Sequence, residues 1–138
     1  MSEISRLVIA IDPAELLILT KEKPKGERDN IIHIKKKASE AHEDLKPYIP
    51  VDFICCDMNI PNLDQMFGII EPLTRHLKVG GFLLFTIKYL NKGGMKKDTH
   101  IESLKKFFPN FGEPVVKALI ANKHEKTVLI QKLKELDN

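Results

Sequence analysis

The 138-residue sequence contains no apolar run long enough to cross a membrane. Such a span takes about 20 consecutive apolar residues. The apolar stretch nearest the amino end covers only residues 8–11, which is also too short for the apolar core of a secretory signal peptide. We therefore expect no membrane partner and a cytoplasmic location.

Cysteine is rare as well, since only Cys55 and Cys56 are present. Successive side chains of a strand point to opposite faces, so two adjacent cysteines in a strand cannot easily pair with each other. We expect both to be reduced packing residues. The five histidines show no metal-ligand spacing with these cysteines, and no metal site is predicted.

Glycine is scarce in the amino-terminal half, where Gly26 is the only one before residue 68. A dinucleotide-binding turn needs several glycines directly after a strand, because its backbone must approach the pyrophosphate closely. Here the apolar run over residues 6–11 is followed by Asp12 and a proline. A nicotinamide-dependent oxidoreductase is therefore only the third of three functional hypotheses.

The composition is that of an ordinary globular domain, with 43% hydrophobic and 30% charged residues. A chain of this length buries about two-thirds of its unfolded surface, so we expect a single domain over residues 1–138. Lys and Arg outnumber Asp and Glu by 22 to 19. This small surplus is compatible with a nucleic-acid partner, although lysine clusters such as residues 35–37 usually mark a solvated face.

The strongest local pattern is the run over residues 51–56, which is apolar except for Asp52 and ends at Asp57. An apolar run without polar alternation predicts a strand buried on both faces, as at the centre of a parallel sheet. In open α/β sheets ligands bind at the carboxyl ends of the strands, so Asp57 is the first candidate for chemistry. The simpler alternative is a carboxylate that caps the following loop.

Further elements follow from periodicity and from turn residues. Strands are predicted over residues 6–11, 31–34, 82–87, 115–121 and 127–131, the last two as an antiparallel hairpin. Helical turns are predicted over residues 14–19, 39–45, 63–77 and 99–108, and loops or turns over residues 21–30, 78–81 and 91–95. Phe107, Phe108 and Phe111 could stack on bases, but their spacing is more typical of a helix core. The order of elements predicts an α/β three-layer sandwich with a mostly parallel sheet.

This order resembles a class I, Rossmann-like methyltransferase that uses S-adenosylmethionine. The strand ending in Asp12 (VIAIDPAEL) matches the position whose carboxylate holds the ribose hydroxyls of the cofactor. Asp57 in VDFICCDMN, Lys88 after FLLFTI and Glu125 in HEKTVLI are similar to three members of the Lys-Asp-Lys-Glu tetrad of FtsJ-like ribose 2'-O-methyltransferases. The similarity extends over nearly the whole chain. It is strongest to the branch related to the large-subunit ribosomal RNA cytidine 2'-O-methyltransferase.

The resemblance implies a role for each of these residues. Lys88 would accept the proton of the ribose hydroxyl, Asp57 would lie near the sulfonium and the lysine, and Glu125 would orient the lysine or the ribose. Asp12, Lys37 and Asp57 would contact S-adenosylmethionine. Lys37 departs from the acid that many relatives carry near the adenine, and a lysine cannot accept the adenine amino hydrogens, so backbone groups would have to do so. The simpler alternatives are a solvated strand-end lysine at Lys88 and a hairpin-tip charge at Glu125.

The sequence departs from the family pattern at its amino end, where no counterpart of the first tetrad lysine, the first strand or the glycine-rich loop is found. Without that strand, two strand edges must meet each other, recruit a partner strand or aggregate. We therefore expect a partial FtsJ-like domain, inactive alone, that acts on RNA as a homo-oligomer or with a partner that supplies the missing segment. Ribosomal RNA is the expected kind of RNA partner. The alternative function is a non-catalytic RNA-binding or assembly module.

Overall fold

The computed structural model describes residues 6–16, 30–60, 62–88, 97–118 and 125–137. Contacts divide the chain into two compact units, Met1–Pro47 and Tyr48–Asn138. Each unit has a sheet of its own. The single domain expected over the whole chain stays a prediction.

The first unit is built around two short parallel strands, β1 (Val8–Ile11) and β2 (Ile31–Ile34). Both consist almost entirely of apolar and β-branched residues, which favour a pleated surface, and both confirm the predicted strands. The expected helix over residues 39–45 is broken into short turns. They are η1 (Ala38–Glu40), α2 (His42–Leu45) and η2 (Lys46–Tyr48), the last extending past the end of the unit.

Two predictions for this unit fall mainly outside the described residues. The helical turns expected over residues 14–19 are absent from residues 14–16, and residues 17–19 are not described. The Oδ1 atom of Asp12 accepts a hydrogen bond of 2.7 Å from the backbone N–H of Ala14. This Asx-type turn competes locally with helix formation. The loop expected over residues 21–30 likewise lies outside the described residues except at its last position.

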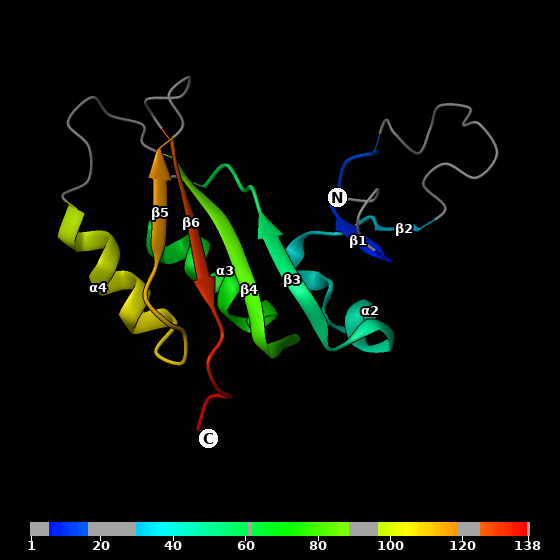
Figure 1. Ribbon diagram of the computed structural model, residues 1–138. Helices are drawn as coiled ribbons and strands as arrows, with labels where there is room; N and C mark the ends of the chain where they lie inside the picture. Colours follow the sequence, from blue (N-terminus) through cyan, green and yellow to red (C-terminus); the bar gives the residue numbers. More distant parts are fainter. Residues whose placement is uncertain (1–5, 17–29, 61, 89–96, 119–124, 138) are drawn as a thin grey trace. The chain divides into compact units, whose positions relative to one another are not determined.

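The second unit contains a four-stranded sheet in the order β3-β4-β6-β5, shown in Figure 1. Its elements are β3 (Val51–Cys56), α3 (Leu63–Thr74), β4 (Leu77–Lys88), α4 (Lys97–Phe107), β5 (Val115–Ala118) and β6 (Glu125–Gln131). β4 pairs in parallel with β3 and antiparallel with β6, and β5 and β6 form the expected antiparallel hairpin. Residues 119–121 of the predicted strand and the loop expected over residues 91–95 lie outside the described residues.

Helices α3 and α4 pack together against one face of this sheet. The fully buried ring of Phe67 lies 5.3 Å from Phe85 of β4 and 5.7 and 5.2 Å from Phe107 and Phe108 of the α4 region, between ring centroids. Phe111 lies 5.5 Å from Phe108. The core role predicted for these phenylalanines is therefore confirmed. Within the described ranges, no helix combines the length and apolar character that a membrane span requires.

The opposite face of the sheet, here called the outer face, is partly open. Phe53 of β3 and Phe82 of β4 are 36% and 39% exposed, and Cys55 is exposed. The prediction that β3 is buried on both faces is therefore wrong, as is the packing role of Cys55. The physical reason is that β3 is an edge strand of its sheet, and α3 and α4 cover only the other face.

A bulge replaces the turn expected over residues 78–81, which instead belongs to the long strand β4. Val51 pairs with Leu77 and Phe53 pairs with Phe82, so β4 advances five residues while β3 advances two. Extra residues on one strand bend it and strengthen its twist. The bulge lets a single strand, Leu77–Lys88, pair with β3 on both sides of the irregularity.

Two glycines make this bulge possible. Gly80 has φ = +85°, a conformation that other residues rarely adopt. A Cβ on Gly81 would lie 2.8 Å from the carbonyl oxygen of Asp52 and 2.9 Å from that of Lys78. Because both are backbone atoms, the chain cannot make room for the added carbon by rotating a side chain.

We predict that Gly81→Ala lowers the free energy of unfolding by about 1–3 kcal/mol, because the β3–β4 backbone must shift to accept a methyl group. Gly68→Ala is the matched control. It lies in α3 with open space around its Cα, and should stabilise by about 0.5–1 kcal/mol. Urea denaturation measures both, and equal stability of the Gly81→Ala protein and the wild type would contradict the bulge geometry.

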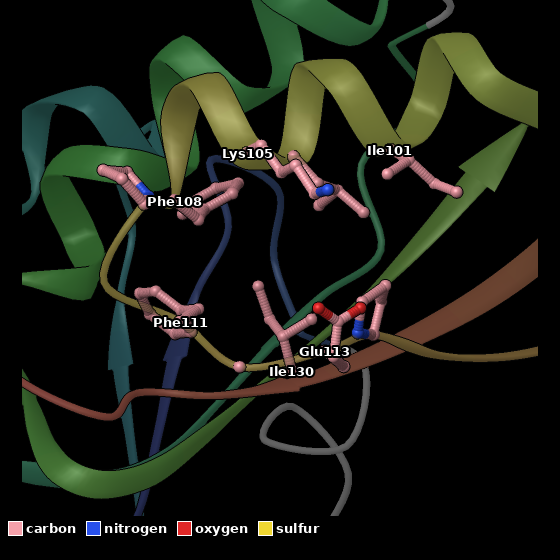
Figure 2. Close-up of a pocket in the computed structure, with 10 residues that line it drawn as sticks. Ile101, Lys105, Phe108, Phe111, Glu113 and Ile130 are labelled. Atoms are coloured by element: carbon pink, nitrogen blue, oxygen red, sulfur yellow. The ribbon is translucent and has the colours of Figure 1, made fainter.

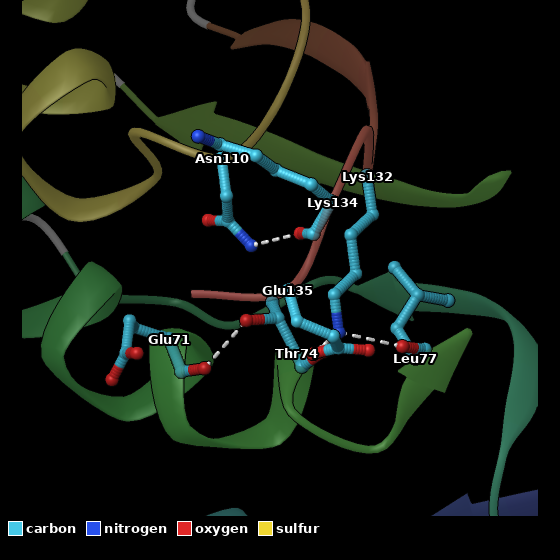
Figure 3. Close-up of polar contacts among 7 residues, drawn as sticks. All are labelled: Glu71, Thr74, Leu77, Asn110, Lys132, Lys134 and Glu135. Carbon is cyan, nitrogen blue, oxygen red and sulfur yellow. Dashed lines mark hydrogen bonds and ion pairs between the residues drawn. The ribbon is translucent and has the colours of Figure 1, made fainter. Parts of the chain in front are cut away.

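A buried lysine links the carboxyl-terminal segment to the end of α3 through hydrogen bonds (Figure 3). Lys132 is 1% exposed, and its ammonium donates to the carbonyl oxygens of Thr74 and Leu77 at 3.1 and 2.8 Å. Its third partner is Glu135, at 2.9 Å. All three N–H donors are thereby satisfied, as a buried ammonium requires.

A cavity of about 330 Å³ lies on the helix-covered face of the sheet. Figure 2 shows it between α4 and the turn that follows, with Phe108, Phe111 and Ile130 among its apolar walls. Lys105 and Glu113 are the charged residues of its lining. None of the site residues predicted from the sequence lines this cavity.

Candidate functional site

Three of the predicted residues meet at one rim of the four-stranded sheet. Asp57 directly follows β3, Lys88 is the last residue of β4 and Glu125 is the first residue of β6. The Lys88 Nζ atom lies 3.0 Å from Asp57 Oδ1, and Lys88 stands directly opposite Glu125 in the antiparallel β4–β6 pair. Facing residues of such a pair have Cβ atoms about 5 Å apart. The structure therefore gathers an amine and two carboxylates.

The side chains of Lys88 and Asp57 differ in how much of their surface is exposed. Lys88 is 20% exposed, whereas Asp57 is 72% exposed. The amine is thus largely shielded and is held in place by an accessible carboxylate. An exposed carboxylate oxygen next to a positioned amine leaves room for a second positively charged or hydroxyl group, because a carboxylate offers about four acceptor sites.

Asp12 lies in the first unit, at the carboxyl end of β1. Its Oδ1 accepts from the Ala14 amide, while its backbone carbonyl is 2.9 Å from His33 Nε2. The carboxylate is exposed, and one of its oxygens is used by the turn. The structure therefore shows the turn-capping role, while the second oxygen is accessible to a further hydroxyl donor.

Lys37 is exposed at the start of η1 with an extended backbone. Its neighbours in the lysine cluster are both paired, Lys35 with Glu15 at 2.7 Å and Lys36 with Asp44 at 2.8 Å. The cluster is thus partly neutralised, in keeping with a solvated face. Asp12 and Lys37 belong to one unit and the Asp57–Lys88–Glu125 group to the other, so the five predicted residues form two separate sets.

The two cysteines report on the surroundings of Asp57. Although Cys55 is exposed as a residue, partial burial of its thiol raises the pKa of that group, and the negative charge of Asp57 raises it further. Burial in the core face raises the pKa of Cys56 to about 12, with a smaller contribution from Cys55. Neither cysteine therefore has the lowered pKa of a catalytic nucleophile.

We predict that alkylation of Cys55 by iodoacetamide becomes fast only above the pH expected for a free thiol, since the thiolate is the reacting form. In a Cys56→Ala background, Asp57→Asn should raise the rate at mildly alkaline pH by roughly two- to fivefold, because a charge that opposes ionisation is removed. Mass spectrometry of the alkylated protein measures the rate.

Asp52→Asn in the same background is the matched control for this experiment. Asp52 is an exposed acid of β3 that is paired with Lys78, and it is not among the groups that shift the pKa of Cys55. Its replacement should leave the alkylation rate unchanged. Equal rates in the Cys56→Ala protein with and without Asp57→Asn would contradict the proximity of Asp57 to Cys55.

Two threonines that were not predicted from the sequence lie beside the site. Thr86 lies two residues before Lys88, and Thr127 lies two residues after Glu125. Because side chains of a strand alternate, these threonines share the outer face with Lys88 and Glu125, and they pair directly with each other. That spacing of two is the signal that could have identified them.

Comparison with known proteins adds a curated relative but no family. No protein-family model matches the chain. The chain is 28% identical over 135 residues to an uncharacterized protein of Methanocaldococcus jannaschii, a match that covers 96% of this chain and 36% of that protein. The chain thus spans about a third of the length of this relative, and the FtsJ-like branch stays a prediction.

Solved structures show the fold. A fibrillarin/Nop5p complex contains a chain that matches with a TM-score of 0.68 and 19% identity, over 92% of this chain and 61% of that one. An rRNA methylase from Streptococcus thermophilus matches with a TM-score of 0.61 and 20% identity, over 96% and 77%. Aeropyrum pernix fibrillarin with natively bound S-adenosyl-L-methionine matches with a TM-score of 0.52 and 19% identity, over 75% and 46%. The predicted α/β class is confirmed, and the chain has a Rossmann-like methyltransferase fold.

Proposed function

We propose that this chain is part of an S-adenosylmethionine-dependent RNA ribose 2'-O-methyltransferase of the FtsJ-like kind. The observation that supports it is the Asp57–Lys88 ion pair of 3.0 Å with Glu125 directly opposite Lys88. The methyltransferase fold, and neighbours whose names include an rRNA methylase and a fibrillarin with bound S-adenosyl-L-methionine, support the same reaction.

In the proposed reaction the bound cofactor supplies an electrophilic methyl group. The protein must then position a ribose hydroxyl in line with it and remove the hydroxyl proton. Lys88 is the candidate for that role: its amine is shielded, fixed by Asp57 and situated at the rim. In its neutral form the amine accepts the hydroxyl proton, and as an ammonium it remains hydrogen-bonded to Asp57. Glu125 lies where it can orient the amine or accept a hydrogen bond from the ribose.

The residues proposed to contact S-adenosylmethionine are suited to that role only in part. The oxygen of Asp12 that its turn leaves unused would accept from a ribose hydroxyl of S-adenosylmethionine, and the exposed carboxylate of Asp57 would face the positively charged sulfonium. Lys37 contributes only through its backbone, since an ammonium has no acceptor for an adenine amino group. A glycine-rich loop is not found in the sequence before Gly68, where Gly26 stands alone, so we propose that another segment supplies it.

That segment would also complete the sheets. In the described residues, β1 and β3 each pair on one side only, and an unpaired edge invites a further strand. The matched chain of the fibrillarin/Nop5p complex and the Methanocaldococcus relative are both longer than this chain. We propose that the first strand and loop come from adjoining polypeptide or from a partner, which includes a second copy.

We predict that isothermal titration detects S-adenosylmethionine and its demethylated product binding to the chain extended by the polypeptide encoded immediately upstream, and weak or no binding to the 138 residues alone. Lys88→Met should leave cofactor affinity within about twofold and reduce methyl transfer about 100-fold or more, because it removes the proton acceptor. Lys134→Met, a surface change, is the matched control.

Two results would count against the proposal. One is the absence of cofactor binding by the extended chain, and the other is full methyl transfer by Lys88→Met.

The second candidate function, a non-catalytic RNA-binding or assembly module, is favoured by the lack of a glycine-rich loop in these residues and by the partial use of Asp12 in its own turn. RNA binding that persists in Lys88→Ala and Asp57→Ala, without cofactor uptake, would support it.

A further inference from the structure

A row of hydrogen-bond donors crosses the outer face next to the Asp57–Lys88–Glu125 group. Thr86 of β4 pairs with Thr127 of β6, and Thr127 pairs with Lys117 of β5. Directly paired residues point to the same face. Because Thr86 and Thr127 alternate with buried Phe85 and Val128, the row of Lys117, Thr127 and Thr86, here called the donor row, lies on the face opposite the helices.

The donor row is accessible to a ligand. Lys117 is exposed, and the threonines are half-buried. Among the residues that the structure describes, none of these three side chains has a hydrogen bond or an ion pair. Lys78 and Lys88, by contrast, are neutralised on the same sheet by Asp52 and Asp57. Among the described residues, Lys117 thus has no ion-pair partner, and it lies beside two unused hydroxyl donors.

The spacing of the donor row suits a strand of nucleic acid that passes the candidate site. Adjacent strands lie about 4.8 Å apart and alternate residues about 7 Å apart, which puts the Lys117 Cα roughly 12 Å from that of Lys88. Lysine and threonine are typical donors to phosphate and sugar oxygens of nucleic acids. No aromatic side chain belongs to the donor row, so it offers contacts to a backbone and no stacking platform for bases.

We propose that the donor row binds the phosphate–sugar backbone of the RNA whose ribose lies at Lys88, with Lys117 as the main phosphate contact. This inference rests on the proposed function for its choice of RNA. Lys117, Thr127 and Thr86 are positioning residues: they hold the RNA strand across β4, β6 and β5 and take no part in proton transfer. The binding is electrostatic and independent of base sequence.

The test is fluorescence anisotropy of a labelled single-stranded RNA, titrated with the 138-residue chain over a series of potassium chloride concentrations. Lys117→Ala should weaken binding by about three- to tenfold at low salt. The slope of log affinity against log salt should become shallower by about 0.7, the value for one phosphate contact on a single strand. Thr127→Val should cause a smaller loss with an unchanged slope, and Lys117→Arg should retain binding.

Lys105→Ala is the matched control, because Lys105 is an exposed lysine on α4, on the helix-covered side. The Lys105→Ala protein should bind RNA as the wild type does. All variants should have the thermal unfolding temperature of the wild type. Wild-type affinity in Lys117→Ala, an equal loss in Lys105→Ala, or no RNA binding by the folded chain would overturn the inference. RNA binding through Lys117, together with no cofactor uptake by the chain extended upstream, would overturn only the proposed methyl transfer.

Discussion

Strand β4 is the constraint on which the candidate site depends. It pairs in parallel with β3 and antiparallel with β6, so the end of β3, the end of β4 and the start of β6 lie at one rim. Three residues distant in sequence are thereby brought together: Asp57, Lys88 and Glu125. The ladder hydrogen bonds and the Phe67–Phe85 core contact hold this register. A one-residue slip would turn Lys88 to the opposite face, away from Glu125.

Much of this arrangement could be predicted from the sequence. Apolar runs identify the strands around Asp57 and Lys88, and the residue that ends a parallel strand must lie at the ligand-binding edge. The hairpin of β5 and β6 follows from two short apolar runs close together, and the antiparallel pairing of β6 with β4 then places Glu125 opposite Lys88. The structure brings Asp57, Lys88 and Glu125 together, whereas their part in methyl transfer is a proposal.

Other features depend on tertiary contacts that no local pattern contains. The exposure of Phe53 and Cys55 follows from the edge position of β3, whereas an apolar run reads the same in an edge strand and a central one. The sequence predicts a turn over residues 78–81, since glycine pairs usually end an element, but here the two glycines form a bulge within β4. Lys132 is buried against the end of α3 because three acceptors surround its ammonium, although lysine is rarely buried.

The reaction proposed for the rim of β3, β4 and β6 is methyl transfer to a ribose hydroxyl. The most direct measurement is mass spectrometry of nucleosides from RNA incubated with the extended protein and S-adenosylmethionine carrying a heavy methyl group. We predict that the label appears on the ribose 2'-oxygen and is absent when Lys88 and Glu125 are both replaced by alanine. Label on a base, or on the ribose regardless of these two residues, would contradict the proposed reaction.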